Sequence, residues 1–79
     1  MFLQVKIGAD NRLLLIPLAH IRFIMDIETA ADAGIDGLET VDRKWARALV
    51  QAVGVGGSTN NFWINEDVET IARKIGAVT

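Results

Sequence analysis

The sequence predicts one small α+β domain, in which a small antiparallel β-sheet of four to five strands carries one C-terminal amphipathic helix on one face. Three observations lead to this fold class. Apolar and polar residues alternate near the N-terminus, a glycine-rich turn separates two strand-like runs, and the last apolar residues recur at helical spacing. The chain has 79 residues, the length of a single domain, so we expect residues 1–79 to form one unit.

An N-terminal hairpin is the first expected element. Residues 2–7 alternate between apolar and polar side chains, as a half-buried strand does. Residues 8–11, Gly-Ala-Asp-Asn, predict a turn because Gly and Asn tolerate positive φ, and residues 13–16 then return as a second strand. Pro17 lacks an N–H, so we expect it to break this strand or to lie at an edge.

A third amphipathic strand is expected over residues 19–25. Alternate positions would place one apolar set on one face: Ala19, Ile21, Phe23 and Met25. The polar set would lie on the other face: His20, Arg22 and Asp26. In the segment 26–44 that follows, Gly34 and Gly37 interrupt any long helix, and a short helix over residues 28–33 is compatible with the sequence.

The segment 45–53 allows two interpretations. Apolar residues recur at helical spacing: Val41, Trp45, Ala48, Leu49 and Ala52. The alternative is a strand over 46–53 that forms a hairpin with a strand over 61–64, through a glycine-rich turn at 54–60. We favour the strand, because the 61–64 run needs a neighbouring strand to be stable.

The C-terminus predicts a helix with a single apolar stripe: Val68, Ile71, Ala72 and Ile75. Asn65 would cap it, and Gly76 would end it as the first residue beyond the helix. Acidic residues in the first turn and basic ones in the last complement the helix dipole: Glu66, Asp67, Arg73 and Lys74. We expect the stripe to pack against Ile21 and Phe23.

Composition restricts the function classes. The chain has no cysteine and one histidine, which excludes disulfides, thiolate metal sites and multi-histidine zinc sites. It is 51% hydrophobic with a mean hydropathy of +0.29, which is high for a monomer of this size and predicts a homo-oligomer, with another protein as the alternative partner. No membrane span or signal peptide pattern is present in the sequence, so we expect a cytoplasmic protein.

Charge is unevenly distributed around a net value of −2. Residues 26–42 contain six acids and no base, which is typical of an acidic, solvated loop. The run Asp32–Gly37 resembles the start of a calcium loop, but Gly34 and Arg43 occupy positions that calcium loops fill with oxygen ligands. The run Gly54–Thr59 lacks the lysine of a phosphate-binding loop. We therefore predict no metal, no cofactor and no catalytic residue.

The candidate interaction surface consists of polar and aromatic residues: His20, Arg22, Arg43, Trp45 and Arg47. Trp45 with its basic neighbours suggests stacking on nucleic acid, but the isoelectric point of about 5.1 and the adjacent acidic segment make nucleic acid the less favoured partner. His20 would need a nucleophile within hydrogen-bond reach, and the sequence places none there.

Two runs together resemble a known family: Leu15 to Ile24 (LIPLAHIRFI) and Phe62 to Ile71 (FWINEDVETI). They are similar to small β-meander proteins of the FlbD type, which occur in flagellar operons and phage-like short reading frames. The resemblance implies an accessory or regulatory binding role and supplies no catalytic residues. The sequence thus predicts a non-enzymatic binding or assembly module. The alternatives are a nucleic-acid-associated regulator and a small enzyme with an inter-subunit site.

Overall fold

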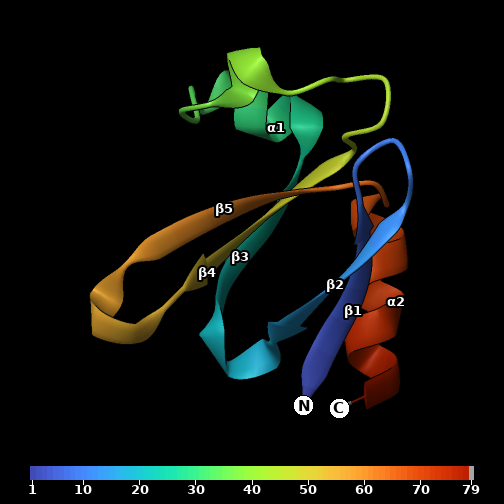
Figure 1. Cartoon of the computed structure of the whole chain (residues 1–79), viewed down its shortest axis with the longest axis vertical. Coiled ribbons are helices and arrows are strands. Elements are labelled where there is room, and N and C mark those ends of the chain that lie inside the picture. Colours follow the sequence, from blue (N-terminus) through green and yellow to red (C-terminus); the bar gives the residue numbers. More distant parts are fainter. Residues whose placement is uncertain (79) are drawn as a thin grey trace.

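The computed structural model describes residues 1–78, and Figure 1 shows their arrangement. The strands in chain order are β1 (Phe2–Ile7), β2 (Arg12–Pro17), β3 (Ile21–Asp26), β4 (Ala48–Val53) and β5 (Thr59–Ile64). The α-helices are α1 (Ile27–Asp32) and α2 (Val68–Val78), and the 3-10 helices are η1 (Leu18–His20), η2 (Leu38–Thr40) and η3 (Val55–Gly57). Five strands with a C-terminal helix confirm the predicted α+β fold class.

The strands form two antiparallel sheets (Figure 1). β1 and β2 make a two-stranded hairpin, and β3, β4 and β5 make a second sheet in that order. The hairpin turn uses positive φ at Gly8 (74°) and Asn11 (54°), as the turn residues predicted. Pro17 is the last residue of β2, where its missing N–H leaves the strand ladder intact.

The core lies between the hairpin, one face of the three-stranded sheet and α2. Its fully buried side chains come from every one of these elements: Leu3, Val5, Ile16, Ala48, Val50, Ala52, Ile64 and Ile71. Figure 1 shows α2 running beside β1 at the edge of the molecule, with both chain ends on that side. The hairpin is thus attached to the rest of the chain by its inner face and by its β1 side.

Within the segment 45–53, residues Ala48–Val53 form a strand, so the favoured interpretation is confirmed and the helical one is wrong. The strand begins two residues later than the expected position 46. β4 is the central strand and pairs with β3 on one side and β5 on the other. Ala48, Val50 and Ala52 face the main core, and Leu49 is fully buried on the opposite face. Because both faces are covered, β4 is apolar at every position except Gln51, and this run of apolar residues resembles a helical stripe.

β3 differs from the expected strand by a register shift between Ile21 and Phe23. Ile21 pairs with Ala52, as an alternating strand requires, but the shift places Ile24, and not Phe23, opposite the core residue Val50. The expected contact of α2 with Phe23 is therefore wrong, and Ile24 packs on the core in its place. A bulge inserts one extra residue and so exchanges the two faces of the strand beyond it.

α2 begins two residues later than expected. The carboxylate of Asp67 accepts a hydrogen bond from the Thr70 N–H at 2.8 Å, so Asp67 and not Asn65 caps the helix. Asn65 Nδ2 donates to the Gly8 carbonyl and to Asn11 Oδ1, which fastens the hairpin turn to the end of β5. The helix also continues through Gly76, which was expected to terminate it.

The acidic segment packs over the far face of the three-stranded sheet. α1 covers the short helix considered over 28–33 but begins and ends one residue earlier. Asp26 caps it by accepting a hydrogen bond from the Thr29 N–H at 2.7 Å. Ala30 of α1 is fully buried, as is Leu49 on β4. Within residues 1–78, neither α-helix has the length and apolar content needed to cross a membrane.

Candidate interaction surface

The outer face of the β1–β2 hairpin carries exposed apolar side chains beside two polar ones, Gln4 and Lys6. Cross-strand pairs alternate between the two faces, so Phe2 with Pro17, Gln4 with Leu15 and Lys6 with Leu13 share the outer one. Among the described residues, the exposed large hydrophobic side chains all belong to the hairpin: Met1, 77% exposed, Phe2, 57%, Leu13, 63%, and Leu15, 57%. We call Phe2, Leu13 and Leu15, which share the outer face, the hairpin patch.

The hydrogen-bond pattern of the hairpin shows which main-chain groups face outward along its two edges. The Leu18 N–H donates to the Met1 carbonyl at 3.0 Å, which marks Met1 and Leu18 as a hydrogen-bonded pair. Bonded and non-bonded pairs alternate in an antiparallel ladder. The main-chain groups of Gln4 and Lys6 on β1, and of Leu13 and Leu15 on β2, therefore point away from the partner strand.

The β1 edge is closed by α2 and the residues before it. The Lys6 N–H donates to the Glu66 carboxylate at 2.9 Å, and the Lys6 carbonyl accepts from the Asn65 N–H at 2.7 Å. The Gln4 carbonyl accepts from Lys74 Nζ at 3.0 Å, and the same ammonium group forms an ion pair with Glu66. These bonds give partners within the chain to three outward groups of this edge: the N–H and the carbonyl of Lys6 and the carbonyl of Gln4.

The β2 edge is open. Within the part of the chain that the structure describes, no hydrogen bond reaches the outward N–H or carbonyl of Leu13 or Leu15. The side chains of both residues are exposed beside these groups. β2 thus offers a strand edge together with an apolar row on the outer face.

A small cleft of about 190 Å³ lies where β2 ends. Its apolar walls come from Leu15, Ile16, Pro17 and Phe62, and the rest of its lining includes His20 and Asn60. The cleft adjoins the β2 edge because Leu15 and Pro17 belong to both. The cleft lies beside Ile16, so an apolar side chain that a partner places next to Ile16 would lie at the cleft.

The five residues of the sequence-predicted surface lie at two places. Arg43, Trp45 and Arg47 belong to the loop that leads into β4, where both arginines are exposed and the indole is half-buried. His20 and Arg22 lie in η1 and at the start of β3, and both are exposed. Since Ile21 pairs with Ala52 and Asp26 with Ala48, these two groups lie toward opposite ends of the three-stranded sheet.

The hairpin patch was missed by the sequence reasoning, although a signal for it exists. An alternating strand with one solvent-exposed face would carry polar residues at 13 and 15, opposite Lys6 and Gln4. The sequence has leucine at both positions. Four consecutive apolar residues at 13–16 in a hairpin with an alternating partner strand therefore indicate apolar side chains on both faces.

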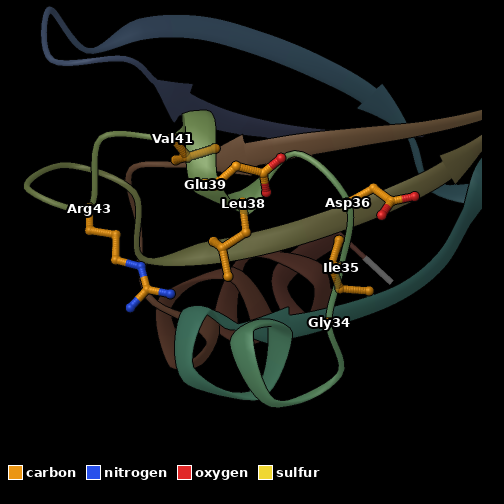
Figure 2. Close-up of a pocket in the computed structure, with 7 residues that line it drawn as sticks. All are labelled: Gly34, Ile35, Asp36, Leu38, Glu39, Val41 and Arg43. Carbon is orange, nitrogen blue, oxygen red and sulfur yellow. The ribbon is translucent and has the colours of Figure 1, made fainter.

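A larger cavity of about 520 Å³ is lined by residues between 34 and 43, in the segment that follows α1 and contains η2 (Figure 2). Figure 2 shows Leu38 projecting from η2 toward α1, with Asp36 and Glu39 on one side of the cavity and Arg43 on the other. The lining contains carboxylates, a guanidinium and aliphatic groups, and contains no hydroxyl, thiol or imidazole. The described residues form no cluster of three or more His, Cys, Asp or Glu that could hold a metal ion.

Two carboxyl groups have perturbed acidity, and both are helix caps. The backbone N–H of Thr29 lowers the pKa of Asp26, and the backbone N–H of Thr70 lowers the pKa of Asp67, because each N–H stabilises the ionised carboxylate. Nearby Arg73 and Arg47 lower the pKa of Asp67 further. These shifts come from the capping hydrogen bonds, so they do not mark an acid–base site.

No family model, curated protein or solved structure matches this chain.

Proposed function

We propose that this protein is a non-enzymatic assembly module that forms a homo-oligomer through the hairpin patch. The observation that carries the proposal is the gathering of Phe2, Leu13 and Leu15, each more than half exposed, on one face of one hairpin. Exposed apolar side chains scattered singly are ordinary, whereas a contiguous group on one surface is typical of an interface. The resemblance to FlbD-type proteins supports the same reading, since it implies a binding role.

Self-association is favoured over other roles by the balance between size and apolar content. A domain of this length buries only about 60–65% of its unfolded surface and has a thin margin of stability. A second subunit that covers Phe2 and the two leucines would remove apolar area from water, at roughly 25 cal/mol for each Å². The fold itself does not use these side chains, because its core is complete on the inner face of the hairpin.

The test is light scattering coupled to size exclusion, over a tenfold dilution at physiological salt. We expect the wild-type chain to be a dimer or larger assembly, and the double variant Leu13→Ser, Leu15→Ser to be a folded monomer. The matched control is Arg43→Ser, Arg47→Ser, which removes two exposed side chains from the other candidate surface and should leave the assembly intact. A wild-type chain that is monomeric at every concentration would refute the proposal.

A further inference from the structure

We propose that two copies of this chain pair through their β2 edges, antiparallel and around a two-fold axis at Leu15, so that the two hairpins form one continuous four-stranded sheet. This inference rests on the proposed function and deepens it, because it names the partner segment and its register. The observation behind it is the contrast between the closed β1 edge and the open β2 edge.

The open β2 edge has an unusual amino-acid composition for an exposed strand. Edge strands of monomeric proteins are commonly protected by charged side chains, by bulges or by a covering element. β1 has such protection from Glu66, Asn65 and Lys74. β2 presents leucine at two of the three positions where its main chain faces outward, and Pro17 at the third. Its edge therefore has both the hydrogen-bonding groups and the apolar flank of a strand-pairing site.

The count of main-chain donors favours a symmetric partner. Each copy offers two outward N–H groups, those of Leu13 and Leu15, because proline has none at position 17. With the axis at Leu15, the two Leu15 residues exchange a pair of hydrogen bonds, and each Leu13 N–H donates to the Pro17 carbonyl of the other copy. All four outward donors are then paired, and no buried N–H is left without an acceptor.

Other registers are less favourable. An axis at Leu13 would oppose Leu15 to Asn11, whose N–H is already bonded to the Gly8 carbonyl within the turn. An axis at Leu14 would bring the charged Arg12 of one copy beside Ile16 and the apolar cleft of the other. The axis at Leu15 instead brings the apolar Leu14 of the second copy beside Ile16.

Charge beyond the ladder agrees with this register. The same axis directs the turn of each copy, which carries Asp10, toward η1 and the start of β3 of the other copy, which carry His20 and Arg22. Asp10 is exposed and is held by an exposed ion pair with Arg12 at 3.3 Å, which costs little to rearrange. An acidic turn would thus meet a basic corner at both ends of the shared sheet.

Cysteine cross-linking tests the register, since the chain contains no cysteine of its own. In a hydrogen-bonded antiparallel pair the Cα atoms are about 5.5 Å apart, which is within the range that disulfides span. Leu15→Cys should therefore form a covalent dimer on mild oxidation. Leu13→Cys is the matched control, because Leu13 is equally exposed but two copies of it would lie about four residues apart along the strands, roughly 13 Å.

We expect the Leu15→Cys dimer to form at least tenfold faster than the Leu13→Cys dimer at equal protein concentration. Equal rates, or faster cross-linking of Leu13→Cys, would overturn the register. A second variant tests the edge itself: Leu15→Pro removes an outward N–H that the hairpin does not use, and Leu15→Ser keeps that N–H.

Leu15→Pro should be a folded monomer by light scattering and circular dichroism, and Leu15→Ser should keep part of the dimer. A Leu15→Pro chain that remains fully dimeric would refute edge pairing while leaving the proposed self-association in place. A monomeric wild-type chain would instead refute the proposed function, so the two failures are distinguishable.

Discussion

β2 and β4 have similar apolar sequences, RLLLIP and ALVQAV, but they occupy opposite situations in the fold. β4 is central in its sheet and is covered on both faces, so four of its six residues are buried. β2 is an edge strand covered on one face, and among its residues only Ile16 is fully buried. Apolar content alone therefore does not define the core of this molecule.

The difference separates residues needed for folding from residues free for other contacts. A strand between two neighbours and two covering layers leaves little surface, so its buried side chains contribute mainly to stability. The leucines of β2 that face outward, Leu13 and Leu15, are more than half exposed and lie outside the buried core. Their retention on the surface is the physical reason to assign them to an interface.

The largest expected effect comes from truncating equivalent leucines in these two strands. Leu49→Ala in β4 removes a fully buried side chain and should lower the free energy of unfolding by about 2–5 kcal/mol. Leu15→Ala in β2 should change it by less than about 0.5 kcal/mol. Urea unfolding, at a dilution where the wild type is monomeric, measures both; similar losses would abolish the distinction between the strands.

The sequence was sufficient for the elements whose apolar pattern has one simple period. The alternation in residues 2–7 and the turn residues Gly8 and Asn11 predicted the hairpin correctly, since both signals are local. The strand over 46–53 required a further argument, because a strand buried on both faces loses its alternation. The glycine-rich turn and the need of β5 for a neighbour decided it.

The remaining features depend on contacts between distant residues. The bulge after Ile21 reverses the faces of β3, and the local alternation of apolar and polar residues contains no signal for it. Asn65 caps no helix because the hairpin turn takes its side chain, a contact across more than fifty residues of sequence. The open β2 edge could be inferred only after the ladder and the closing bonds of β1 were known.

A smaller effect should come from opening the edge of β1 that α2 closes. Glu66 accepts the Lys6 N–H and pairs with Lys74, and its side chain is only 10% exposed. Glu66→Ala leaves both donors without this acceptor, so we expect a loss of about 1–3 kcal/mol in unfolding free energy.

The control for this edge is Glu69→Ala, which breaks an exposed ion pair with Arg73 one helical turn apart and should cost about 0.3–0.5 kcal/mol. Chemical denaturation measures the unfolding free energy of both variants. It compares a carboxylate that bonds to a strand edge with one that forms only an exposed ion pair on the helix surface. If Glu66→Ala lowers the unfolding free energy no more than Glu69→Ala does, the bonds that close the β1 edge do not stabilise the fold. The two edges of the hairpin would then differ in geometry but not in energy.

The smallest expected effect concerns the loss of stability at acidic pH. Strands of the three-stranded sheet lead into helices with capping carboxylates, and the hairpin has no such cap. Asp67 at the start of α2 and Asp26 at the start of α1 have pKa values lowered from the usual 3.8 by the N–H groups they accept. Between the lowered pKa and that value, the unfolded chain binds more protons than the folded one, so stability falls as pH falls through this interval. The contribution is complete above about pH 5 and is lost at lower pH.

Asp67→Asn keeps a side chain that can cap a helix but cannot titrate, so its unfolding temperature should depend less steeply on pH between about 5 and 2 than that of the wild type. Asp26→Asn should behave in the same way through α1. Thermal melts across this range measure both slopes, with Asp10→Asn in the hairpin turn as the control, since Asp10 caps no helix. An unchanged slope in Asp67→Asn would mean that the capping bond is absent in solution. A slope that changes equally in Asp10→Asn would mean that overall charge controls acid unfolding, and the caps would then not distinguish the sheet from the hairpin.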